Sequence, residues 1–392
     1  MKKSFLLSAN IVTLVLLLSA CSGGSRTSSH SETPVDTVKF SYAENIRILK
    51  FKDYTKVELR NPWDTLKTLH TYILTDRNRD KNRNRDRDRD NANTGNLPEG
   101  TVVRTPLTSA IVYSSVHNSL LAETGAIESI AGVCDIQYIK HPQIKAMYEK
   151  GSIADCGSSM SPDIEKIIDL NADAVLLSPF ENNGGYGRIE SIGIPIIECA
   201  DYMETSPLGR AEWMKFYGLL TGKEEEADSL FRKIEKQYLT LKHMTKDVHD
   251  RPTVITELKY SSAWYVPGGR STTARMINDA GGDYIFSYTK ESGSVPMSFE
   301  TVLDKGQKAD FWLIKYNQKQ DKTYSELKND YSPYTNFDAW KNKRIFGCNT
   351  SYVNFYEETP FHPETLLRDL IIIFHPEIMK NEKTRYYTEL KF

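Results

Sequence analysis

Two segments of the sequence repeat one pattern, and each carries a glutamate at a point where it could be recognised by a partner. Glu165 follows Ser-Pro-Asp-Ile, and Glu300 follows Met-Ser-Phe; in both segments an Ala-Asp pair then leads into an apolar run. This order predicts a helix that begins near the glutamate, followed by a buried strand. An acidic residue in a first helical turn also complements the helix dipole, by about 0.3–1 kcal/mol. Position alone therefore does not separate a structural role from a recognition role.

The sequence contains none of the common motifs of hydrolytic or phosphate-binding enzymes. It contains no G-x-S-x-G nucleophile elbow, no glycine loop that would hold a phosphate and no H-E-x-x-H zinc motif. The short run Val266-Pro267-Gly268-Gly269 does not replace them. A hydrolase is the competing interpretation of the two-lobed architecture predicted below, but without such a motif we expect no enzymatic activity.

The composition of the chain excludes several classes of protein. The chain has 392 residues with 50 Lys and Arg against 52 Asp and Glu, a formal charge of −2. This balance argues against a nucleic-acid partner. Hydrophobic residues make up 39%, including 22 Tyr, which is enough for more than one packed core and excludes a collagenous or fully disordered chain. Five cysteines without a C-x-x-C pair indicate neither a disulfide scaffold nor a zinc site.

The first residues have the features of an export signal. Lys2 and Lys3 precede an apolar run from Phe5 to Ala20, and the exit reads Leu18-Ser19-Ala20-Cys21. This exit resembles a bacterial lipoprotein signal, which implies that residues 1–20 are removed and that Cys21 is lipidated. Residues 21–37 then form a flexible tether. We expect a periplasmic protein anchored to a membrane by lipid, because more than one acyl chain anchors stably.

The rest of the chain divides by its patterns into five parts. Residues 38–75 predict a short strand-rich extension, and residues 76–100 a charged, low-complexity, disordered insert. An anion-binding arm is the alternative interpretation of this insert. Residues 101–205 and 247–392 predict two α/β lobes, with connecting helices at 206–246. The predicted strands are Ala110–Val116, Ser129–Val133, Ala174–Ser178, Pro195–Glu198, Thr253–Leu258, Phe311–Ile314 and Arg344–Gly347, with helices between them.

Strands that alternate with helices favour a parallel sheet flanked by helices. We therefore predict the α/β class: two Rossmann-like lobes joined by a long rigid connecting helix, with a ligand cleft between the lobes. Since a helix of about twenty residues spans about 30 Å, such a connector lets the cleft open only modestly. Thr221 and Glu224 further predict a capping box at the start of the second connecting helix.

The order of these features resembles a known family. The two glutamate segments, the strand end Ala131-Gly132-Val133, the turn Gly193-Ile194-Pro195 and the helical connector are similar to the periplasmic binding proteins for vitamin B12 and iron–siderophore complexes. The last predicted helix, within residues 363–377, is similar to that of the iron-complex members. The resemblance implies an ABC permease with its ATPase as partners, and it implies that Glu165 and Glu300 dock on permease arginines. A monomer suffices for this delivery.

The resemblance also implies a bulky ligand held by aromatic and polar residues from loops after the strands. The expected ligand is a ferric siderophore, with cobalamin or haem as alternatives; a scavenging or storage lipoprotein without a permease is a further one. No resident cofactor is expected. The candidate ligand-binding residues are Tyr138, Phe180, Tyr186, Trp264, Tyr265, Arg270, Tyr352, Phe355 and Tyr356.

Direct binding of a bare metal ion is a weaker hypothesis. The eight histidines are scattered, and His117, His141 and His362 are the ones that could reach a cleft. Lone histidines of this kind are more often ordinary surface or core residues. Haem is the stronger alternative, because Tyr or His can ligate its iron. Cys134 and Cys156 fall in one lobe, and an oxidising compartment would permit a disulfide between them.

Overall fold

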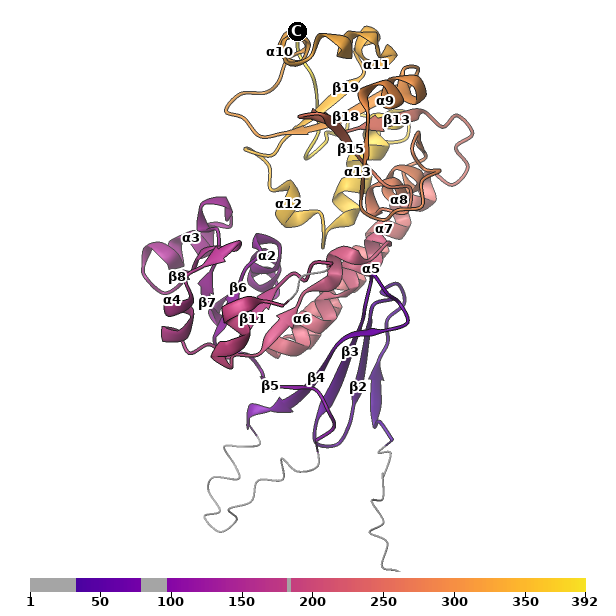
Figure 1. Ribbon diagram of the computed structural model, residues 1–392. Coiled ribbons are helices and arrows are strands. Elements are labelled where there is room, and N and C mark those ends of the chain that lie inside the picture. The colour runs from indigo at the N-terminus through magenta and orange to yellow at the C-terminus, as the bar shows by residue number, and fades with distance from the viewer. Residues whose placement is uncertain (1–32, 79–96, 182–184) are drawn as a thin grey trace, which may run out of the picture. The chain divides into compact units, whose positions relative to one another are not determined.

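The computed structural model describes residues 33–78, 97–181 and 185–392. Cys21 and most of the charged insert lie outside the described residues. Within these ranges the chain forms three large sheets and a set of connecting helices (Figure 1). No helix in the described ranges combines the length and the apolar character needed to cross a membrane.

The strand-rich extension is a five-stranded sheet in the order β1-β2-β3-β4-β5. Its first four strands pair antiparallel, and β5 pairs parallel to β4. Ile48, Val57 and Tyr72 are fully buried in it, and the Tyr72 ring packs at 6.5 Å from Phe216 of a connecting helix. The strands are β1 (Asp36–Val38), β2 (Ile46–Lys50), β3 (Thr55–Arg60), β4 (Thr68–Asp76) and β5 (Thr101–Thr105).

The extension is fixed to the connector by two buried carboxylates. Glu212 accepts hydrogen bonds from the backbone N–H groups of residues 41–43, and Glu204 accepts them from residues 44 and 45. The Trp213 indole also donates to Glu204, at 2.9 Å. Because buried carboxylates need such donors, the extension and the connector stabilise one another.

The N-terminal lobe is built on a parallel sheet in the order β12-β11-β6-β7-β8. The predicted strand Ala110–Val116 is shorter in the structure, because the Ser114 side chain accepts from the Val116 N–H and begins a helix. The strands are β6 (Ala110–Val112), β7 (Ile130–Val133), β8 (Ala154–Asp155), β11 (Ala174–Leu177) and β12 (Ile196–Glu198), with α2 (Ser115–Glu123), α3 (Pro142–Glu149) and α4 (Ile164–Asp169) between them. A small hairpin, β9 (Gly157–Ser158) with β10 (Ser161–Pro162), follows β8.

The connector consists of α5 (Pro207–Glu212), α6 (Met214–Thr221) and α7 (Glu224–Met244). The long helix α7 has 21 residues, which agrees with the predicted rigid element. The capping-box prediction was wrong: the Thr221 hydroxyl donates to the Tyr217 carbonyl, and no side chain caps α7. Gly222, at φ +69°, makes the turn between α6 and α7 instead.

The C-terminal lobe has a second sheet in the order β16-β13-β18-β19-β20. All neighbours pair parallel except β20, which pairs antiparallel to β19. A separate three-stranded sheet, β14-β15-β17, is formed by segments that lie between β13 and β18 in the chain. It carries two of the predicted ligand residues, Trp264 and Tyr265. The main sheet comprises β13 (Thr253–Thr256), β16 (Asp283–Tyr284), β18 (Phe311–Tyr316), β19 (Ile345–Asn349) and β20 (Thr388–Glu389). The small sheet comprises β14 (Lys259–Tyr260), β15 (Ala263–Pro267) and β17 (Ser294–Met297).

The helices of this lobe begin at clear sequence signals. The Ser271 side chain caps the first of them and Ser298 the second, while Thr323 and Glu326 form a capping box on the third. The helices are α8 (Thr272–Asp279), α9 (Phe299–Gly306), α10 (Tyr324–Asp330), α11 (Asp338–Lys341), α12 (Phe355–Glu358) and α13 (Pro363–Phe374). The α/β fold with parallel sheets flanked by helices is therefore confirmed.

Candidate functional site

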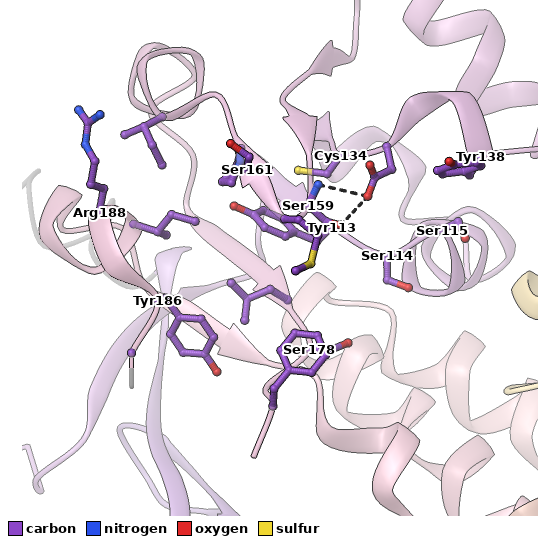
Figure 2. Close-up of a pocket in the computed structure, with 18 residues that line it drawn as sticks. Tyr113, Ser114, Ser115, Cys134, Tyr138, Ser159, Ser161, Ser178, Tyr186 and Arg188 are labelled. Carbon is purple, nitrogen blue, oxygen red and sulfur yellow. Dashed lines mark hydrogen bonds between the residues drawn. The ribbon is translucent and has the colours of Figure 1, made fainter. Parts of the chain in front are cut away.

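A cavity lies at the carboxyl ends of the strands of the N-terminal lobe, where open α/β sheets bind ligands. We call it the N-lobe pocket; its volume is about 870 Å³ (Figure 2). Side chains after β6, β7 and β11 line it, together with the β9–β10 hairpin and the segment that follows β11. The lining residues include Tyr113, Ser114, Ser115, Cys134, Asp135, Tyr138, Ser159, Met160, Ser161, Ser178, Phe180, Tyr186 and Arg188.

A turn at Asp135 holds one side of the pocket in place. Asp135 has a left-handed backbone, with φ 53°, which few residues other than glycine adopt without local support. Its carboxylate accepts hydrogen bonds from the Ser159 hydroxyl at 2.5 Å and from the Ser159 N–H at 3.1 Å (Figure 2). These bonds tie the β9–β10 hairpin to the end of β7, so Ser159 and Ser161 of the hairpin lie at the pocket.

Two neutral groups lie deeper in the pocket. Tyr113 is only 9% exposed, and its hydroxyl has no hydrogen-bond partner among the described residues. Burial raises the pKa of the Tyr113 phenol above its usual value, and it does the same for the Cys134 thiol. Both groups therefore stay protonated at neutral pH, and the Tyr113 hydroxyl can donate to a ligand.

Exposed apolar side chains surround the opening. Tyr138, Met160 and Phe180 expose 69%, 85% and 62% of their surface. Tyr186 is held more firmly, because its hydroxyl donates to Glu198 at 2.6 Å. Large exposed apolar groups gathered at one cavity are typical of a ligand site. The predicted residues Tyr138, Phe180 and Tyr186 thus lie together, while their contact with a ligand stays a prediction.

The candidates from the C-terminal lobe do not line this pocket. Trp264 is fully buried: its ring packs on Trp312 and Phe337, and its indole donates to the Thr256 carbonyl. Phe355 is also buried, against Tyr386 and Tyr387. Assigning these two rings to a ligand was wrong in this structure, because both fill the core. Tyr265, Arg270, Tyr352 and Tyr356 are exposed on the C-terminal lobe.

The histidines named in the sequence have protein partners. His117 is buried, and its Nε2 lies 2.7 Å from Asp201; burial alone would raise the pKa of Asp201, but His117 and Arg210 lower it to about 2. His362 lies between Glu123 and Glu364. Burial lowers the pKa of His141. None of the three lines the pocket, and no group of three or more His, Cys, Asp or Glu in the described ranges is placed to hold a metal ion.

The predicted disulfide is wrong. Cys134 and Cys156 are both free and buried, and the Cys134 thiol faces the Cys156 carbonyl at 4.0 Å. Burial raises the pKa of Cys156 to about 11, so it too is a neutral thiol. The pair fills the apolar layer beneath the pocket with Ile111 and Val175.

The two glutamates of the repeated pattern lie on exposed first turns. Glu165 is in α4, capped by Asp163, and Glu300 is in α9, capped by Ser298. The pKa of the Glu300 carboxyl is lowered by hydrogen bonds from its own backbone and from Ser298, so it is ionised at neutral pH. Both carboxylates face solvent, as a docking role requires.

The sequence reasoning missed most of the pocket's polar residues. Tyr113 and Ser114 fall within the predicted strand Ala110–Val116, and the early end of β6 instead places them at the pocket. Ser178 ends a predicted strand, and the rule that ligands bind at strand carboxyl ends could have found it. Met160 and Arg188 carried no such signal, because their positions depend on the folding of the hairpin and of the segment after β11.

Comparison with known proteins supports one family. Residues 110–352 match the family described as "Periplasmic binding protein". A relative from Methanocaldococcus jannaschii, named "Uncharacterized lipoprotein MJ0878", is 31% identical over 73% of this chain and 69% of its own length.

Two solved structures share the fold. One is a periplasmic heme binding protein from Pseudomonas aeruginosa, with a TM-score of 0.55 and 14% identity, covering 73% of this chain and 99% of that one. The other is titled an ABC-type Fe3+-hydroxamate transport system from Saccharomonospora viridis, with a TM-score of 0.54 and 16% identity, covering 69% and 94%. On the family match and the lipoprotein relative, this chain belongs to the periplasmic binding protein family.

Proposed function

We propose that this protein is an extracytoplasmic lipoprotein that captures a bulky metal chelate, foremost a ferric siderophore, between its lobes and delivers it to an ABC-type permease. The observation that carries the proposal is the N-lobe pocket. Its volume of about 870 Å³ lies in the upper part of the range for small-molecule sites, roughly 300–1,000 Å³.

The pocket's chemistry suits a complete chelate better than a bare ion. Its donors are hydroxyls, and its thiol and phenol stay protonated. Metal ions in proteins are bound by carboxylates, imidazoles or thiolates, and the histidines lie elsewhere. Hydroxyls and aromatic faces instead match the amide oxygens and apolar surface of an organic chelator.

The charged residues of the pocket lining indicate which chelates can bind. Asp135 and Arg188 are the charged residues of the lining, and Asp135 is already occupied by Ser159. This balance favours chelates of low net charge, such as ferric trihydroxamates, over trianionic ferric catecholates, which would need several cations. Cobalamin fits the charge argument as well. Haem fits less well, because a neutral Tyr113 would be a poor ligand for its iron and Arg188 is the single basic residue of the lining that could pair with its two carboxylates.

Fluorescence titration of the purified protein tests the ligand. We expect saturation with ferrichrome, a neutral ferric trihydroxamate, and at least about ten-fold weaker binding of ferric enterobactin, which carries three negative charges. Cobalamin and haemin are titrated in parallel. Saturation by cobalamin or haemin alone would replace the siderophore assignment, and saturation by none of the four would contradict the proposal.

Delivery to a permease is assigned to Glu165 and Glu300. Both are exposed, and a carboxylate on each lobe can pair with arginines of a partner. The variant Glu165→Ala with Glu300→Ala should keep chelate affinity and abolish uptake by cells. The matched control replaces the exposed Glu149 and Glu291, one on each lobe, and should transport normally. Unchanged uptake by the first variant would refute the docking role of the two glutamates.

The membrane anchor is assigned to Cys21 on the sequence signal and on the lipoprotein name of the relative. Cells fed a labelled fatty acid should incorporate the label into the wild-type protein but not into Cys21→Ala. The variant should also appear in the soluble extracytoplasmic fraction. A labelled Cys21→Ala protein would refute this assignment.

A further inference from the structure

A second cavity lies where the extension sheet meets the outer edge of the N-terminal lobe. We call it the outer recess; its volume is about 700 Å³. It shares Phe180, Gly185 and Tyr186 with the N-lobe pocket, but its other walls differ. Those walls are Leu69, His70, Thr101 and Val102 from β4 and β5, with Pro179, Glu190, Gly193, Ile194, Pro195, Ile196 and Glu198 from the lobe. The strands β4 and β5 precede the family match, so this cavity is a feature of the added sheet.

Two carboxylates accept hydrogen bonds from Tyr186, one from its hydroxyl and one from its backbone N–H. Glu198 accepts from the Tyr186 hydroxyl at 2.6 Å, and Glu190 accepts from the Tyr186 N–H at 2.7 Å. Burial, and then the hydrogen bond to Glu198, raise the pKa of the Tyr186 phenol, which therefore stays neutral. The recess thus carries two acidic groups beside an aromatic ring.

Glu198 is incompletely satisfied. The residue is only 8% exposed, and its Oε2 makes no hydrogen bond with any described residue. The nearest basic group is His70, whose Nδ1 lies 3.3 Å from this same Oε2, an ion pair whenever the imidazole is protonated, and whose Nε2 is 2.8 Å from the Thr101 hydroxyl. While the imidazole is neutral, the buried oxygen has no positive partner and no hydrogen bond, which is costly, so a cationic donor in the recess would be favoured. Glu190, being exposed, adds a second carboxylate that such a donor can reach directly.

The remaining walls are apolar. Leu69, Val102, Ile194 and Ile196 offer aliphatic surface, and Phe180 and Tyr186 offer ring faces, which attract cations. A ligand that matches all of these walls has a positively charged head and an apolar body. A metal ion does not match them, because the described residues form no group of three metal-ligating side chains there.

We propose that the outer recess binds a small organic amine, with its ammonium group near Glu190 and Glu198 against the Tyr186 ring and its apolar part along Val102 and Ile194. This site gives the added sheet a binding role. It does not depend on the chelate proposed for the N-lobe pocket, so the two can fail separately.

Calorimetric titration of the full chain with benzylamine tests the site, with benzyl alcohol as a neutral probe of nearly the same shape. We expect saturable 1:1 binding of benzylamine and at least about ten-fold weaker binding of benzyl alcohol. Glu198→Gln and Glu190→Gln should each weaken benzylamine binding. Glu149→Gln, an exposed site on the same lobe, should not change it.

A cavity-filling variant locates the binding. Val102 is 44% exposed on the wall of the recess, so Val102→Trp should fold normally and block the site. Thermal unfolding of each variant checks folding, and Val102→Trp keeps the test valid if Glu198→Gln unfolds. Absence of benzylamine binding, equal binding of both probes, or binding that survives Val102→Trp would each overturn the proposal.

Discussion

Each lobe is built on a five-stranded, mainly parallel sheet, but the two sheets differ in strand order and use the carboxyl ends of their strands differently. In the N-terminal lobe, Ser114, Asp135 and Ser178 follow β6, β7 and β11 and leave a pocket. In the C-terminal lobe, Glu257 follows β13 and forms an ion pair with Lys315 of β18, while the Trp312 indole donates to the Glu257 carbonyl. Small side chains after the strands leave space, whereas large ones fill it.

The lobes also share one backbone feature. Asp135 and Glu257 both have left-handed backbones, with φ 53° and φ 67°, just after a parallel strand. In one lobe the carboxylate organises a pocket wall, and in the other it pairs with a partly buried lysine. Equal local geometry therefore does not imply an equal role: the Asp135 carboxylate shapes a cavity, whereas the Glu257 carboxylate stabilises packing within its lobe.

We expect the largest effect on the free energy of unfolding from replacing a buried aromatic residue rather than an exposed one. Trp264→Ala should lower the free energy of unfolding by about 3–5 kcal/mol, because it empties a fully buried site. Phe180→Ala should change it by no more than about 0.5 kcal/mol, because Phe180 is 62% exposed. Urea denaturation measures both. Equal losses in the two variants would mean that the assignment of packing and binding is wrong.

The next largest effect concerns ligand affinity. Ser178→Trp places an indole in the N-lobe pocket and should weaken binding of the chelate found by titration by about 100-fold. Ser262→Trp, at an exposed turn of the C-terminal lobe, is the matched control and should bind normally. If both variants bind alike, the ligand lies outside the N-lobe pocket.

A smaller effect tests the Asp135 turn. Asp135→Ala removes two hydrogen bonds to Ser159 and leaves a β-carbon in a left-handed backbone without the carboxylate bonds that support it, at a total cost of about 1–3 kcal/mol. Asp135→Asn keeps an acceptor and a residue tolerant of this backbone, so it should cost less. Asp135→Gly relieves the backbone alone and should fall between them. Urea denaturation that gives another order would contradict the role assigned to this turn.

The sequence predicted the fold better than the site, for a physical reason. Strand and helix patterns are local, so the two parallel sheets and the long helix followed from them. In β15 the side chains of Trp264 and Tyr265 point to opposite faces, and only tertiary packing decides which face is buried. The outer recess depends on β4 and β5 meeting the lobe at Phe180, Ile194 and Glu198, a long-range contact that no local pattern records.

A pH dependence is expected at a contact between the lobes. His362, at the start of α13, bonds Glu123 of α2 at 2.7 Å and Glu364 at 3.0 Å. Burial alone would lower the pKa of His362, but these hydrogen bonds outweigh burial and raise the pKa to about 10. Because the folded-state pKa lies above the unfolded value of 6.5, the protonated pair stabilises the protein fully below about pH 6.5. That contribution declines as the pH rises and is lost near pH 10.

The matching measurement compares the melting temperatures of wild type and His362→Gln from pH 6 to pH 10. The wild type should be the more stable at pH 6, and the difference should shrink steadily towards pH 10, since the uncharged imidazole and the amide then interact similarly with the carboxylates. His249→Gln, an exposed histidine in the segment after α7, controls for general effects of losing a histidine. A constant difference across this range would show that His362 contributes by packing alone, and the lobes would then meet there without a charge contact.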